Sequence, residues 1–270
     1  MFTQEMIDHY NWLQGEGVTL KMIVGHYFNS LDVSYCSISQ FLERISQVQY
    51  DMRIANPLNL FGTDGLSFDI DLYMGLYDAL ECPNRYVTFV QYNGKPYLLA
   101  VPREMKIQDI TNFLSRHSDK QLRNAKDDDV DSIIRFLDAR TNMQCEDSPM
   151  GYVQLLHFAK YGDNFNLSKC HEIGVNCVVT TKQQVARFAQ KLESGMYDWE
   201  PDIWNRLKDA AADLEPRIEL SDDYCIIEWV EIESKYGMFR RKYRISRTRY
   251  KIERLSETVL ASVTVNRHAL

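Results

Sequence analysis

Hydrophobic residues in the first fifty positions recur at the spacing of amphipathic helices. Apolar residues at positions 7, 10 and 13 form one stripe, and a second stripe of six runs from Leu20 to Leu31. Ser37 is a typical N-cap for a third helix, whose apolar face continues from Ile38 to Val48 and which Asn56-Pro57 ends. The i, i+3, i+4 repeat therefore predicts three short helices.

The period changes to that of strands after residue 85. Tyr86–Tyr92 and Pro96–Val101 flank Asn93-Gly94, a dipeptide whose preference for positive φ suits a type I′ turn, so the pattern predicts a β-hairpin. Two helices are expected next, at about 107–117 and 129–139. Carboxylates that stabilise a helix N-terminus precede or begin the second one: Asp127, Asp128, Asp129 and Asp131.

The stretch Cys145–Met150 is polar and has neither a helical nor a strand period, which predicts a boundary between two lobes. We expect an acidic helical lobe with a β-hairpin over 1–147 and an α+β lobe over 148–270. The same pattern also fits a single domain, because 270 residues lie within the range of one large domain.

Beyond this boundary, Asn176–Thr180 predicts a short buried strand, and Thr181 is the expected cap of a helix that Gly195 ends. A second helix is expected from about Pro201 to Leu214. Strands are predicted at 224–234, 238–252 and 258–265, with a turn at 235–237. The fold class is therefore α+β, with a helical N-terminal region, antiparallel β-hairpins and a C-terminal antiparallel sheet packed with helices.

Composition predicts a sizeable core, since 45% of the residues are hydrophobic. We expect the protein to be cytoplasmic for two reasons. No run approaches the roughly 18 apolar residues of a membrane span, and the N-terminus lacks the pattern of a secretory signal. The six cysteines are scattered and include no CxxC pair. In a reducing compartment we expect them to be buried thiols rather than disulfides.

Charge is segregated along the chain, although the net charge is only −7. Residues 1–150 hold 13 basic and 21 acidic side chains, and residues 151–270 hold 18 and 17. The sharpest reversal lies in the second half, where 201–234 has 3 basic and 10 acidic residues and 235–254 has 9 and 1. Because charges act locally, over about one Debye length of 8–10 Å, this distribution says more about partners than the total does.

The N-terminal helices could also form a helix-turn-helix, in which the third helix would read DNA. That helix offers only Arg44 and Arg53 for phosphate contacts, and the first hundred residues hold 5 basic and 11 acidic side chains. The charge therefore disfavours DNA binding at this end.

A nucleotidyltransferase signature is suggested by Phe61–Leu72, where a Gly-Thr pair is followed by Asp69 and Asp71. In that family alternating aspartates on a strand hold two metal ions. Only five residues separate Thr63 from Asp69, too few for the intervening helix, and the following hairpin brings no third carboxylate. We interpret the segment as a polar loop.

Two further metal-site patterns are also incomplete. Asp223, Glu233 and Lys235 match the order of a PD-(D/E)xK nuclease, but the acids lie ten residues apart on one predicted strand, at most about 33 Å, so no ion would bridge them. Cys170-His171 and Cys177 lack a fourth zinc ligand nearby. We therefore predict no catalytic residue, no metal site and no cofactor.

The basic run Phe239–Ile252 interleaves cations with aromatic residues and leaves two interpretations open. An exposed strand of this kind would bind phosphates and stack on bases. Alternatively, the acidic strand Ile227–Glu233 lies opposite in the predicted hairpin, and Glu–Arg pairs across the ladder would neutralise the arginines.

If the arginines are paired internally, the acidic side chains are the charge left for a partner. Carboxylates bind Arg/Lys-rich protein segments through charge-assisted hydrogen bonds and fast, salt-sensitive association. The candidate partner-binding residues are Asp127, Asp128, Asp129, Asp131, Asp198, Glu200, Asp202, Asp213, Glu215, Glu219, Asp222 and Asp223.

In size, acidity, tyrosine content and absence of an enzyme signature, the whole chain is similar to the degradosome-interacting early proteins of giant Pseudomonas phages. The similarity is one of overall character and includes no motif, so it assigns no residue. It implies a non-enzymatic homodimer, in the host cytoplasm, that binds and inhibits a basic RNA-binding region of a host protein such as ribonuclease E. The alternative is a direct nucleic-acid-binding protein, or a metal-dependent nuclease or nucleotidyltransferase.

Overall fold

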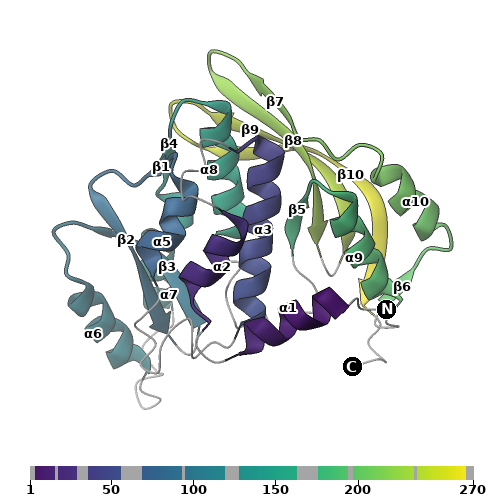
Figure 1. Ribbon diagram of the computed structural model, residues 1–270. Helices are drawn as coiled ribbons and strands as arrows, with labels where there is room; N and C mark the ends of the chain where they lie inside the picture. Colours follow the sequence, from purple (N-terminus) through teal and green to yellow (C-terminus); the bar gives the residue numbers. More distant parts are fainter. Residues whose placement is uncertain are drawn as a thin grey trace. The chain divides into compact units, whose positions relative to one another are not determined.

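The computed structural model describes residues 4–15, 18–28, 36–55, 69–92, 95–118, 128–162, 176–193, 197–233 and 236–265 (Figure 1). The fold is α+β, as predicted. Unit 1 comprises Met1–Asp32, Val48–Cys145 and Phe158–Cys170, and unit 2 comprises Val33–Gln47, Glu146–His157 and His171–Leu270. Each unit draws on both halves of the sequence, and the division at 147/148 stays a prediction about domains that fold alone.

Three helices form the N-terminal region, as the periodicity predicts: α1 (Gln4–Gln14), α2 (Leu20–Tyr27) and α3 (Ile38–Ile54). In unit 1 they are joined by the buried carboxylate of Asp51 on α3. It accepts hydrogen bonds from the Tyr27 hydroxyl at 2.5 Å and from His9 Nε2 at 2.9 Å. A polar contact to each of the first two helices thus fixes α1 and α2 against α3.

The predicted hairpin of unit 1 is confirmed as β2 (Arg85–Tyr92) and β3 (Lys95–Pro102), whose register pairs Tyr92 with Lys95. The Asn93-Gly94 turn lies outside the described residues. Val90, Leu99 and Val101 of the hairpin form a core with helices α6 (Ile107–Ser118) and α7 (Asp128–Leu137), both of which were predicted. Unit 1 also contains the short elements α5 (Ile70–Met74), β1 (Leu80–Glu81) and β4 (Gln144–Cys145).

Unit 2 is built on an antiparallel sheet whose strands follow the order β5-β8-β9-β10-β6, with β7 also paired to β8 (Figure 1). The strands are β5 (Cys177–Val179), β6 (Tyr197–Trp199), β7 (Arg217–Leu220), β8 (Tyr224–Glu233), β9 (Gly237–Ser246) and β10 (Ile252–Val265). The predicted strand over 238–252 is too long. Tyr250, directly after the turn at 247–249, has a φ of 52°, and β10 begins at Ile252 rather than at 258.

One face of this sheet packs on helices. Val230 and Ile232 of β8 and Met238 of β9 form a core with α9 (Lys182–Leu192) and α10 (Ile203–Ala210). The helix predicted after Thr181 is confirmed: the Thr181 hydroxyl accepts from the backbone N–H of Gln184, whose side-chain oxygen accepts from the Thr181 N–H. The helix expected over 201–214 is shorter than predicted.

Helix α8 (Pro149–Tyr161) was not predicted. Every residue from Gly151 to Phe158 is buried, so the helix has no polar face and shows no amphipathic period. The polar stretch expected to end at Met150 instead runs from the short strand β4 into the first turn of α8.

Gly237 begins β9 with a φ of +124°, and a Cβ placed there would lie 1.9 Å from the carbonyl oxygen of Ala261 on β10. We expect Gly237→Ala to lower the free energy of unfolding by about 2–4 kcal/mol, from backbone strain together with the steric clash. Urea unfolding measures this loss. Gly25→Ala is the matched control, because a Cβ at this exposed helical position meets nothing within 4 Å and should be neutral or stabilising. Equal stability of the two variants would contradict the expected strain.

Candidate functional site

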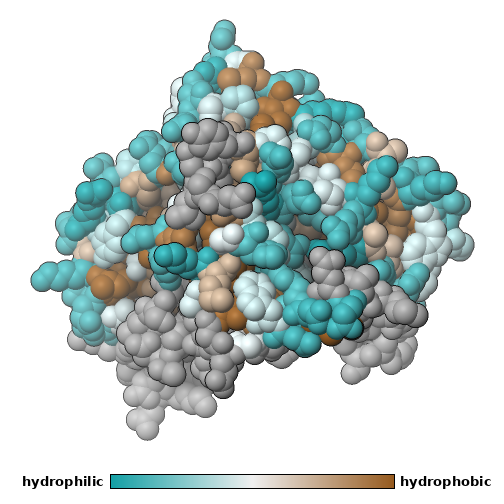
Figure 2. Space-filling model, in the orientation of Figure 1, coloured by the Kyte–Doolittle hydropathy of each residue, from teal (hydrophilic) through white to brown (hydrophobic). Residues whose placement is uncertain are grey.

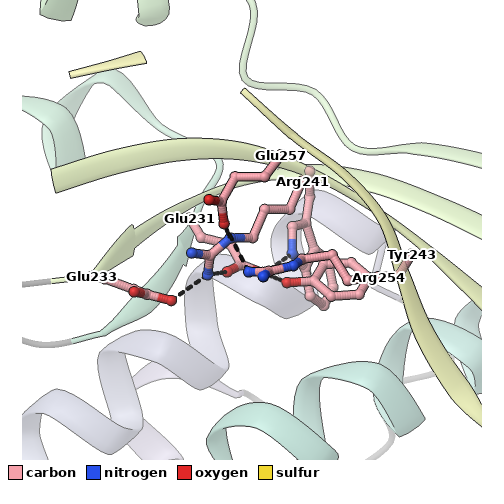
Figure 3. A network of polar contacts seen from close by, with 7 residues as sticks. Glu231, Glu233, Arg241, Tyr243, Arg254 and Glu257 are labelled. Carbon is pink, nitrogen blue, oxygen red and sulfur yellow. Dashed lines mark hydrogen bonds and ion pairs between the residues drawn. The ribbon is translucent and has the colours of Figure 1, made fainter. Parts of the chain in front are cut away.

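A buried carboxylate lies on the face of the C-terminal sheet opposite to Val230 and Ile232, which pack in the core with α9 and α10. Glu231 on β8 has 0% of its side chain exposed. Its Oε1 accepts from Trp229 Nε1 at 2.5 Å and from the Tyr243 hydroxyl at 2.8 Å, and its Oε2 accepts from Arg241 at 2.7 Å (Figure 3). The strand register explains why these side chains lie together. Trp229 pairs with Arg241, and the alternation of side chains along β8 turns Glu231 to the same face.

Arg241 is the cation shared by three carboxylates. Besides Glu231, it donates to Glu233 at the end of β8 and to Glu257 on β10, the latter at 2.7 Å (Figure 3). Its guanidinium also lies over the ring of Phe239, 4.6 Å from the centroid. Burial alone would lower the pKa of Arg241, but the hydrogen bonds to Glu233 and Glu231 raise it above its ordinary value. The network joins three neighbouring strands.

Three other arginines of the basic run, Arg240, Arg244 and Arg247, also have carboxylate partners in unit 2. Arg240 lies 3.2 Å from Asp213 and 3.5 Å from Glu228, and Arg244 lies 2.6 Å from Glu253. Arg247 donates to Asp147, and this hydrogen bond holds the pKa of that carboxyl below its ordinary value. Of the two interpretations that the sequence leaves open, the geometry therefore matches internal pairing. The partners Glu228, Glu231 and Glu233 lie on the strand that the sequence predicts.

Among the described residues, those that resemble catalytic motifs are not arranged as an active site. Asp69 is the N-cap of α5, accepting from the N–H of Leu72 at 2.9 Å, and Asp71 lies in the first turn, so the pair is not on a strand. Asp223 precedes β8 and Glu233 ends it, where it binds Arg241. The glycines before Asp69, and the Cys170-His171 pair, lie outside the described residues. Within the described ranges, no group of three or more His, Cys, Asp or Glu is arranged to hold a metal ion.

The predicted partner-binding residues fall into separate places. In unit 1, Asp128, Asp129 and Asp131 lie in the first turn of α7, and Asp127 lies outside the described residues. In unit 2, six of the exposed predicted acids lie in two groups, one near β6 at the end of the sheet order and one near β7, which pairs with β8 (Figure 1). The members near β6 are Asp198, Glu200 and Asp202, and the members near β7 are Glu219, Asp222 and Asp223.

Two further predicted residues, between α10 and β7, already have partners. Asp213 binds Arg217 at 2.6 Å as well as Arg240, and Glu215 accepts from the Ser39 hydroxyl at 2.8 Å. The sequence reasoning did not single out Trp199 and Trp204, which flank Glu200 and Asp202. The sequence feature that could have identified them is the alternation of tryptophans and acids over 198–204.

Comparison with protein-family models, curated proteins and solved structures finds no match to the chain. In the part of the chain that the structure describes, no helix is long and apolar enough to cross a membrane.

The hydrogen bonds around Glu231 should contribute to the free energy of unfolding. Arg241→Met should lower the free energy of unfolding by about 3–5 kcal/mol, because it leaves a buried carboxylate without its cation. Arg254→Met is the control: Arg254 lies 2.7 Å from Glu257 and is half exposed, so its loss should cost less than about 1 kcal/mol. Adding Glu231→Gln to Arg241→Met should recover part of the loss in urea unfolding. Failure of that recovery would show that the uncompensated charge is not the cause.

His157 on α8 should make the free energy of unfolding depend on pH. The side chain is fully buried, and burial lowers its pKa from 6.5 to about 3, although the charge of Glu231 opposes this shift. Between these two values the unfolded chain binds a proton that the folded chain does not, so stability falls as the pH is lowered, by about 1.4 kcal/mol per pH unit. His157→Gln should flatten the dependence of the unfolding free energy on pH between 6 and 4. An unchanged slope in the variant would refute the assignment.

Proposed function

We propose that this protein is a non-enzymatic interaction protein that binds an Arg/Lys-rich segment of another protein. The observation that carries the proposal is the internal pairing of the basic run. Arg240, Arg241, Arg244 and Arg247 all contact carboxylates within unit 2, whereas acids near β6 and β7 lie exposed. The exposed carboxylates near β6 and β7 are therefore the charges of this unit that we propose for a basic partner.

Exposed carboxylates suit a basic protein segment rather than a nucleic acid. They form charge-assisted hydrogen bonds with guanidinium groups and repel phosphates. A basic segment that binds RNA would therefore lose its RNA when this protein covers it. The proposed partner is the basic RNA-binding region of a host RNA-degradation protein. The resemblance in overall character suggests ribonuclease E. We also propose that the protein is a phage early protein and acts as a homodimer in the host cytoplasm.

Fluorescence anisotropy tests the charge preference directly. We expect a labelled ten-residue arginine peptide to bind, with an affinity roughly tenfold weaker in 300 mM than in 50 mM salt, because exposed charge pairs are screened. A labelled single-stranded RNA of ten nucleotides should not bind. RNA binding without peptide binding would favour the direct nucleic-acid binder instead.

Competition tests the inhibition. Labelled RNA is first bound to the isolated basic RNA-binding segment of ribonuclease E, and this protein is then added. The expected result is release of the RNA at concentrations near those that bind the arginine peptide. Retention of the RNA at saturating protein would contradict the proposed inhibitory role.

A further inference from the structure

Two tryptophans form an exposed pair next to the end strand of the C-terminal sheet. Trp199 ends β6 and is 36% exposed, and Trp204 lies in the first turn of α10 and is 41% exposed. Their ring centroids are 6.1 Å apart, with the ring planes inclined at 65°. Large aromatic side chains placed together at a surface commonly mark an interaction site.

Local structure explains why both indoles lie on the same side of the sheet. Trp199 pairs with Val263 of β10, whose side chain belongs to the core shared with α9 and α10. Ile203 and Leu207 turn the apolar face of α10 into that core, which leaves the neighbouring Trp204 outside. In Figure 2, apolar and hydrophilic atoms lie side by side over the region of α10.

Two carboxylates belong to the same short segment as the tryptophan pair. Glu200 and Asp202 lie between the two indoles in the sequence, and both are exposed. Asp202 occupies the N-cap position of α10 but makes no capping hydrogen bond with its side chain. Glu200 binds the guanidinium of Arg206, which is anchored independently by the carbonyl oxygens of Val259 and Leu260. Arg206 therefore already engages one carboxylate oxygen of Glu200, so a partner guanidinium would share this carboxylate with Arg206.

We propose that the Trp199–Trp204 surface, defined as residues 199–204, binds an arginine side chain of the basic partner segment. The inference rests on the proposed function and names its site. A guanidinium stacks on indole rings and donates paired hydrogen bonds to a carboxylate, whereas an ammonium does so less well. The surface should thus prefer arginine over lysine. The same carboxylates would repel a phosphate.

The acidic group near β7 has a similar charge but lacks an available aromatic face. Its neighbour Tyr224 is 39% exposed, yet the guanidinium of Arg244 already lies over that ring, 4.8 Å from the centroid. This group therefore provides a matched control for charge alone.

The experiment compares paired variants by anisotropy with the arginine peptide and with a lysine peptide of equal length. Glu200→Gln with Asp202→Asn removes two charges from the Trp199–Trp204 surface, and Asp222→Asn with Asp223→Asn removes two near β7. Trp204→Ala removes one indole, and Phe136→Ala removes an aromatic of unit 1 that is 62% exposed. Thermal unfolding checks that each variant is folded.

We expect the first charge variant and Trp204→Ala each to weaken arginine-peptide binding at least tenfold, and the two controls to change it less than twofold. Trp204→Phe should retain part of the affinity, and the lysine peptide should bind the wild type several-fold more weakly. Wild-type protein that binds no basic peptide would overturn the proposed function itself. If the wild type binds but the Glu200 and Trp204 variants bind equally well, or the β7 variant alone loses affinity, only the assignment of this surface is overturned.

Discussion

The buried carboxylate of Glu231 is the constraint on which the C-terminal sheet depends. A charge taken out of water is stable only when several donors replace its hydration. Trp229, Tyr243 and Arg241 supply three such donors. Trp229 lies on the same strand as Glu231, whereas Tyr243 and Arg241 reach it only in the observed register of β8 and β9. A slip of one residue would turn Arg241 away from Glu231 to the opposite face of the sheet, so the network selects this pairing over its alternatives.

The same constraint decides how the basic run can act. Arg241 faces inward to Glu231, and its neighbours Arg240 and Arg244, on the other face, meet Glu228 and Glu253. A sequence that looks like a nucleic-acid-binding strand thus serves as the cationic half of a charged sheet. The carboxylates outside this arrangement near β6 and β7 are then the surface charges on which the proposed function is built.

Local patterns predicted those elements whose signals lie within a few residues. The hairpin β2–β3, the helix after Thr181 and the strand β8 follow from turn, capping and period rules. Helix α8 was missed because its residues from Gly151 to Phe158 are buried on every side and show no amphipathic period, and β6 because three residues show no period. The separation of β9 from β10 depends on a left-handed residue, Tyr250, that has no glycine to mark it.

For the candidate site, the sequence predicted the acidic residues but not which side chains lie together. Acidity near residues 198–202 was evident, but the pairing of Trp199 with Trp204 depends on how β6 and α10 share one core. The partners of the arginines were partly predictable. Glu228 and Glu231 come from the adjacent strand, whereas Asp147 lies a hundred positions from Arg247 and no sequence rule connects them.

Arg206 has a consequence for the solubility of the fold. In the described part of the sheet, β6 pairs only with Val263–Val265 of the long strand β10. An open strand edge invites pairing with another chain and hence aggregation. Arg206 donates to the carbonyl oxygens of Val259 and Leu260, and the register of β10 against β9 is irregular at Leu255 and Leu260. By occupying two acceptors on an already uneven strand, this side chain makes β10 a poor template for fibril growth.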